Sequence, residues 1–151
     1  MTLEICLDAP ASILVAERGG AHRIEVCSSL AEGGLTPNPG LIDFACRNFS
    51  GDVMIMLRPR GGDFIYSEAE MEVILGDLQA ARQAKVKGVV LGALTPTGDI
   101  NESQLAQVME AAGSMEVTFH RAFDVCRDLS SALEILIRHR VTRVLTSGGK
   151  P

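Results

Sequence analysis

Short apolar runs alternate along the chain with longer segments in which apolar residues recur every three or four positions. The short runs are typical of β-strands and the longer segments of amphipathic helices, because the two structures have side-chain periods of about 2 and 3.6 residues. Six strands are predicted, with onsets about 20 to 35 residues apart, the length of one strand–helix unit. They cover residues 3–7, 23–27, 53–57, 89–91, 117–120 and 143–146.

Signals at the ends of the helical segments support this division. Ser67 and Glu70 have the spacing of a capping box, in which the serine side chain accepts from a backbone amide and the glutamate reaches back to the cap. Pro10 and Pro39 suit the first turn of a helix, where a missing N–H costs nothing. The regular alternation predicts a parallel sheet with right-handed crossovers.

Two parallel α/β architectures fit this order, the doubly wound open sheet and the closed (β/α)₈ barrel. The first strand–helix turn, LDAPAS, lacks the glycines that let a dinucleotide-binding turn approach a pyrophosphate. The strands also carry Glu4, Glu25 and Arg58, which suit the inside of a barrel near its mouth better than a central strand buried on both faces. We therefore expect residues 1–151 to form one TIM-type barrel domain with about six of its eight strand–helix units present.

A barrel that lacks two units would have two free sheet edges and an open core. A fragment and a rearranged or partner-completed barrel are both compatible with the sequence. In either case we expect self-association, most simply as a dimer, to cover the edges and the apolar surface.

Composition narrows the class of protein. The chain has 46% hydrophobic residues and a formal net charge of −5, which argues against nucleic acid as a partner because both would be negatively charged. The opening MTLEICLDAP is not typical of a signal peptide, and no apolar run approaches the roughly 20 residues that span a bilayer. We expect a cytoplasmic protein with no membrane partner, whose four cysteines are free thiols.

Two of these cysteines occupy matching positions near the ends of the first two strands. Glu4 and Cys6 share one face of the first strand, and Glu25 and Cys27 share one face of the second. If both faces point into the barrel, the cysteines meet near its mouth, because neighbouring strands are about 4.8 Å apart. Two thiolates can hold Cu(I), so the pair is a candidate metal site, while the alternative is a pair of small buried apolar residues.

A positively charged loop follows the third strand. Two close buried carboxylates need compensation, and we expect Arg58 to supply it because a guanidinium binds carboxylates in a fork. The result would be either a neutralised polar layer or a substrate site in which Glu25 is an acid or base. Arg58 and Arg60, followed by Gly61-Gly62, are also candidates for binding a carboxylate or phosphate, and the alternative is a solvated turn.

The last two strands end in further polar residues. His120 follows the fifth strand, and histidine is the usual proton carrier because it titrates near neutrality, with Asp124 close enough in sequence to orient the imidazole. A structural histidine bonded to a carboxylate is equally compatible. After the sixth strand, Ser147 precedes Gly148-Gly149, which are candidates for an anion-binding turn.

Taken in order, these segments resemble the CutC copper-homeostasis family. The motifs are LEICLDAPASILVAERGGAHRIEVCSSLAEGGLTPNPGLI, RPRGGDFIYS, VVLGALTPTGDI, TFHRAFD and TSGGKP, and they look like those of a close bacterial member. The resemblance implies a (β/α)₈ barrel, of which this chain is similar to about the first two-thirds. It further implies a cytoplasmic protein that binds Cu(I) through Cys6 and Cys27, and a polar group at the barrel mouth without a settled reaction.

Two functions are therefore considered. In the first, the chain binds Cu(I) as part of copper homeostasis through Cys6 and Cys27, with Met54, Met56 or Cys126 nearby. In the second, it is an enzyme of lyase, isomerase or hydrolase type that acts on a small anionic metabolite. The catalytic residues would then be Glu25, Arg58, His120 and Asp124, and the substrate-binding residues Glu4, Arg60 and Ser147. A purely structural barrel is disfavoured by the cost of burying charged groups.

Overall fold

The computed structural model describes residues 1–148 and contains one sheet of six parallel strands. The strands follow the order of the sequence, and each pairs with the next. They are β1 (Glu4–Leu7), β2 (Arg23–Val26), β3 (Asp52–Met56), β4 (Gly88–Leu91), β5 (Glu116–Phe119) and β6 (Arg143–Val144). The helices between them are α1 (Pro10–Arg18), α2 (Pro39–Asn48), α3 (Glu68–Gln83), α4 (Glu102–Ala112) and α5 (Leu129–Arg138).

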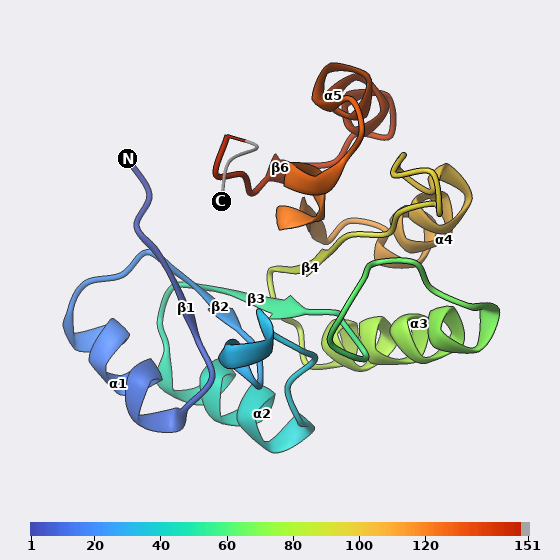
Figure 1. The fold of residues 1–151 in the computed structure, drawn as a ribbon. Coiled ribbons are helices and arrows are strands. Elements are labelled where there is room, and N and C mark those ends of the chain that lie inside the picture. The colour runs from blue at the N-terminus through green and yellow to red at the C-terminus, as the bar shows by residue number, and fades with distance from the viewer. Residues whose placement is uncertain (149–151) are drawn as a thin grey trace.

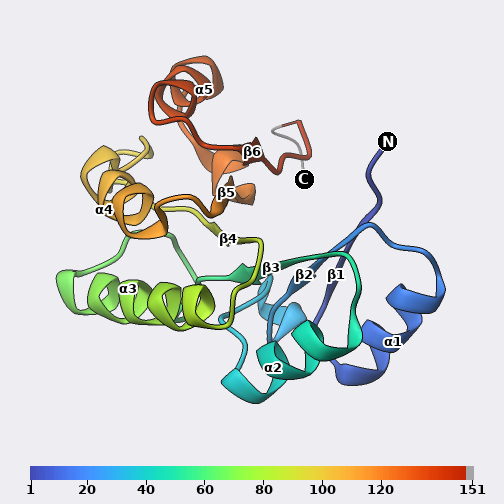
Figure 2. The same cartoon turned by 180° about the vertical axis from the view of Figure 1, so that it is seen from behind.

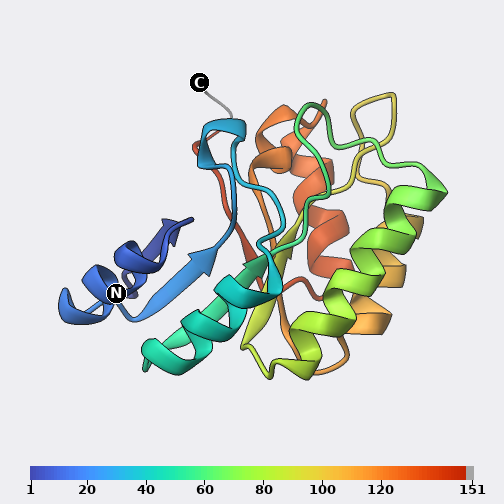
Figure 3. The same ribbon diagram turned by 90° about the horizontal axis from the view of Figure 1, so that it is seen from below.

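The sheet is curved, and the helices lie on its convex side (Figures 1 and 2). This arrangement confirms the predicted TIM-type barrel, of which residues 1–148 form six strands and the five helices between them. Within residues 1–148, β6 does not pair with β1, so the barrel is open. Figure 3 shows that the loops following β2, β3, β4 and β5 gather at one end of the sheet, the end at which barrel enzymes place their active sites.

The period of two in each strand divides the side chains between two environments. Outward-facing residues such as Ile24, Ile55 and Val89 are fully buried against the helices in the main apolar core. Inward-facing residues include the polar side chains of Glu25 and His120, which are also buried. The sheet therefore has an apolar outer face that carries stability and a partly polar inner face that is free for chemistry.

The helix signals in the sequence are confirmed. The Ser67 side chain accepts from the Glu70 amide, while the Glu70 carboxylate accepts from the Ser67 amide, which completes the capping box of α3. Pro10 and Pro39 are in the first turns of α1 and α2. No helix among residues 1–148 has the length and apolar character required to cross a bilayer.

The strand ends differ slightly from the prediction. Strands β2, β3, β5 and β6 end one or two residues early, because the chain turns into a loop there. The amides of Cys27, Leu57 and His120 nevertheless still donate to the carbonyls of the neighbouring strands. Two short 3₁₀ helices, η1 (Leu30–Glu32) and η2 (Arg121–Val125), follow β2 and β5, and they are too short to leave a periodic signal in the sequence.

Candidate functional site

The C-terminal ends of the strands surround a cavity of about 480 Å³ on the inner face of the sheet. Its walls are formed by Glu4, Cys6, Glu25, Leu30, Glu32, Gly33, Met56, Arg58, Phe64, His120, Arg121 and Leu145. Five residues predicted from the sequence are thereby brought together, namely Glu4, Cys6, Glu25, Arg58 and His120. Their chemical roles stay predictions, but they have the shared location that any such role requires.

The two predicted cysteines are in contact. Cys6 pairs with Glu25 in the ladder between β1 and β2, which places Cys27 diagonally across from Cys6. The two Sγ atoms are 3.4 Å apart, and the Cys6 thiol also donates to Glu25 Oε1 at 3.4 Å. Cys6 is exposed whereas Cys27 is buried. The ligand atoms of Cys6, Glu25 and Cys27 all lie within 4.8 Å of one another, a spread that one metal ion can bridge.

Both Cys6 and Glu25 hold their protons more firmly than they would in water. The hydrogen bond with Cys27 raises the pKa of the Cys6 thiol, and burial and the Glu25 charge act in the same direction. Burial raises the pKa of Glu25, although the hydrogen bond from Cys6 partly opposes this. A cation that binds here must therefore displace protons, since thiolates are the ligand form of cysteine.

Arg58 is buried in the cavity wall, but the prediction that it neutralises the buried carboxylates is wrong. Its Nη1 donates to the carbonyls of Glu32 (2.6 Å) and Gly34 (3.3 Å), and its Nη2 donates to the carbonyl of Gly62 (2.8 Å). These carbonyls are reachable because the loops contain glycines, and Gly34 has a φ of 88° that other residues rarely adopt. The Glu4 carboxylate instead pairs with Arg23 at 2.7 Å.

His120 lies at the end of β5 and is 4% exposed. Its Nδ1 accepts a hydrogen bond from the amide of Ala122 at 3.1 Å. Burial lowers its pKa to about 3, and the nearby charge of Arg58 adds to this effect. The imidazole is therefore neutral at physiological pH.

Two other residues have roles that differ from those predicted. Asp124 does not orient the imidazole of His120, because its carboxylate accepts from Arg121 at 3.0 Å and from Thr146 and Ser147 on the next strand end. Arg60 does not line the cavity, because it forms ion pairs with Asp63 and with Glu70 at the start of α3.

The remaining predicted residues lie at the border of the site. The Ser147 hydroxyl contacts Asp124 at 3.0 Å and accepts from Arg121 at 2.9 Å, so it belongs to a polar group beside the cavity. The predicted anion-binding turn includes Gly149, which lies outside the described residues, as do Lys150 and Pro151 of the TSGGKP motif. Cys126 packs in a different apolar cluster and is not a ligand of the cysteine pair.

The polar groups of the cavity have apolar partners that the sequence pattern does not indicate. The Phe64 ring lies 4.8 Å from the imidazole of His120 and 4.9 Å from Cζ of Arg58, measured from the ring centroid. The aromatic residue two positions after Gly61-Gly62 is the available signal, and the positive charge of this loop obscures it. Met56, which also lines the cavity, packs with Cys27 in a small buried cluster.

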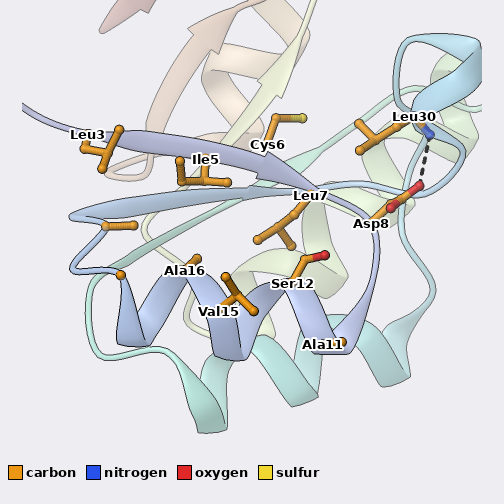
Figure 4. A pocket seen from close by; sticks show the side chains of 12 residues that line it. Leu3, Ile5, Cys6, Leu7, Asp8, Ala11, Ser12, Val15, Ala16 and Leu30 are labelled. Atoms are coloured by element: carbon orange, nitrogen blue, oxygen red, sulfur yellow. Dashed lines mark hydrogen bonds between the residues drawn. The ribbon is translucent and has the colours of Figure 1, made fainter.

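A second hollow, of about 460 Å³, lies between β1 and α1 on the outer side of the sheet (Figure 4). Ile5 and Leu7 point toward α1 in this view, whereas Cys6 points away from the helix. The carboxylate of Asp8 accepts from the amide of Leu30 at 3.2 Å, which ties the end of β1 to η1. The alternation along β1 thus places its only thiol on the inner face.

Comparison with known proteins places this geometry in a family. Residues 1–151 match the CutC family. A CutC family protein of Mesorhizobium japonicum is 48% identical over 146 residues, covering 97% of this chain and 57% of that protein. The copper homeostasis protein cutC homolog of Homo sapiens is 45% identical over 146 residues, covering 97% of this chain and 54% of that protein. The crystal structure of CutC from Streptococcus agalactiae has a TM-score of 0.91 and 31% identity, covering 100% of this chain and 76% of that one.

The chain thus spans a little more than half the length of these curated relatives. The similarity includes all six strands and the loops that form the cavity, because it extends over almost the whole chain. The match along the sequence and the shared fold agree with the family indicated by the motifs. The chain belongs to the CutC family.

Proposed function

We propose that this chain binds Cu(I) through Cys6 and Cys27 in the cytoplasm and contributes to copper homeostasis. The observation that carries the proposal is the 3.4 Å separation of the two Sγ atoms on the inner face of neighbouring strands. Family membership supports it, because the human relative is named a copper homeostasis protein homolog. Copper is the cargo of this site rather than a resident cofactor.

The donor set suits a soft cation. Thiolates and thioethers are soft ligands that favour Cu(I) over hard cations such as Mg²⁺. Met54 and Met56 pack with Cys27 in one buried cluster, so sulfur also surrounds the buried side of the pair. A carboxylate from Glu25 completes the group on the other side. This mixture favours Cu(I) at the thiols, with Glu25 in a supporting role.

The difference in exposure between the two cysteines gives an order of events. Cys6 is exposed and lines the cavity, so an incoming ion reaches it first, and the buried Cys27 thiol lies directly behind it. The Cys6 thiol must lose its proton to become a ligand. Glu25 Oε1 already accepts the hydrogen bond of that thiol and is the nearest group to receive the proton. Glu25 then passes the proton to solvent, so binding releases protons overall and the affinity rises with pH.

The test is an anaerobic titration of Cu(I) against a competing chelator. Wild type is compared with Cys6→Ala, Cys27→Ala and the double variant, and Cys46→Ala and Cys126→Ala serve as matched controls because these cysteines lie outside the pair. We expect wild type and both controls to bind a single Cu(I) equally well. Each change within the pair should weaken binding by at least the roughly 10- to 100-fold that loss of a supporting contact costs other metal sites.

Equal Cu(I) binding by wild type and the double variant would end the proposal. Loss of binding in the Cys46 or Cys126 variant would move the site elsewhere on the chain. Circular dichroism of each variant establishes that a lost affinity is not a lost fold.

A further inference from the structure

The cavity contains two buried donors that the copper site does not use. Nε of Arg58 and Nε2 of His120 are both buried, and neither has a hydrogen-bond partner among residues 1–148. Both side chains line the same cavity. Buried polar groups in proteins are nearly always hydrogen-bonded. Because both nitrogen atoms are covered by neighbouring atoms here, a ligand that supplies their acceptors must enter as the two side chains shift toward the cavity.

Arg58 also lacks a counter-ion. Its hydrogen bonds go to three neutral backbone carbonyls, and it forms no ion pair with a carboxylate of residues 1–148. The guanidinium keeps its charge under all physiological conditions. A buried cation without an anion is costly, and an anionic ligand in the cavity would remove that cost.

His120 presents a neutral N–H to the same space. Because Nδ1 accepts from the Ala122 amide, the single proton of the neutral ring is assigned to Nε2. The Phe64 ring contacts both the imidazole and the guanidinium, so the three side chains form one packed group whose donors are held in place. The imidazole is thus suited to donate a hydrogen bond to a ligand oxygen rather than to shuttle protons.

The carboxyl groups on the cavity wall limit the charge of the ligand. Glu4, Glu25 and Glu32 all line the cavity, so a doubly charged phosphate would be close to several carboxyl groups. A single carboxylate needs only the two donors and carries one charge, which matches the one uncompensated arginine. A cavity of about 480 Å³ has room for a small organic molecule beyond the carboxylate itself.

We propose that Arg58 and His120 bind the carboxylate of a small organic acid in this cavity. The site goes beyond the proposed copper function, because it uses different side chains and different ligand chemistry. Neither site requires the other to be occupied.

The first test is isothermal titration calorimetry of the copper-free chain in a buffer without carboxylates. The probes are acetate, pyruvate and inorganic phosphate. We expect the two carboxylates to bind to wild type and phosphate to bind more weakly. His120→Phe, which keeps a ring beside Phe64 but removes the donor, should weaken carboxylate binding at least about tenfold. His139→Phe is the matched control, because His139 lies at the end of α5 and does not line the cavity, and it should bind like wild type.

Wild type that binds neither acetate nor pyruvate would overturn the proposal, as would a folded His120→Phe variant with unchanged affinity. Binding of phosphate in preference to both carboxylates would overturn the ligand class. If the variant does not fold, nuclear magnetic resonance of wild type labelled with ¹⁵N-histidine replaces it. The Nε2–H resonance of His120 should then shift on addition of acetate, and an unchanged resonance at high acetate concentration would equally exclude the site.

Discussion

His120 is a histidine whose surroundings suppress its titration. Burial and the neighbouring Arg58 charge lower its pKa to about 3, while the unfolded chain holds a histidine of ordinary pKa near 6.5. At pH values between about 3 and 6.5, His120 is protonated in the unfolded state but not in the folded state. Stability therefore rises with pH in this window and is lost as pH falls below about 6.5.

This linkage gives a prediction for the His120→Phe variant. Between pH 7.5 and pH 5, the free energy of unfolding of wild type should fall by about 2 kcal/mol more than that of the variant. Urea unfolding at both pH values measures the difference. His22 and His139 are present in both proteins, so their contributions cancel. Identical pH dependence in the two proteins would mean that His120 titrates normally in the folded state.

The contrast between Cys6 and Arg58 shows which residue contacts a sequence can reveal. The contact of Cys6 with Cys27 follows from side-chain alternation and from the pairing of consecutive strands, which are both visible in the pattern. The partners of Arg58 are carbonyls in two loops. These carbonyls point toward Arg58 because Gly33, Gly34 and Gly62 in those loops have positive φ angles. No periodic pattern encodes those angles, so the predicted carboxylate partner was wrong.

At the scale of elements, the start of α3 explains why Arg60 is absent from the cavity. The Glu70 carboxylate accepts from the Ser67 amide in the capping box and also pairs with Arg60. These contacts lower the pKa of Glu70 to about 2, the largest cause being the hydrogen bond from the Ser67 backbone. The capping box was predictable from its spacing, but the ion pair was not, because it joins a loop to a helix end ten residues later.

Removing the cap should therefore destabilise the fold without altering the site. We expect Ser67→Ala to lower the free energy of unfolding by about 1 kcal/mol, the typical cost of losing a serine cap. Ser103→Ala, at an exposed position within α4, is the matched control and should change stability by less than about 0.5 kcal/mol. Urea denaturation measures both, and the Cu(I) affinity of both variants should equal that of wild type. An unchanged stability in Ser67→Ala would mean that solvent replaces the cap at no cost.

At the scale of the whole molecule, β1 both contributes Glu4 and Cys6 to the cavity and forms one edge of the open sheet. The cavity is built from strand ends and loops between β1 and β6. Among residues 1–148, β1 pairs only with β2, so its other backbone edge is unpaired. An unpaired strand edge is a template for association. Apolar side chains are exposed beside that edge, including Leu3 and Val15. This face is therefore the surface on which the self-association expected from the sequence is best tested.

We therefore expect the chain to self-associate through the face formed by β1 and α1. Val15 lines the hollow between these elements and is 58% exposed, so an aspartate there would disfavour burial in an interface without disturbing the core (Figure 4). Val73 on α3 is similarly exposed, at 53%, and lies away from the sheet edges, which makes Val73→Asp the matched control. In sedimentation velocity at micromolar concentration, wild type and Val73→Asp should be heavier than a monomer, while Val15→Asp should shift toward the monomer. A monomeric wild type would show that the edge is tolerated in solution, and an associated Val15→Asp would place the interface elsewhere, with the exposed Leu133 and Ile137 of α5 as the next surface to change.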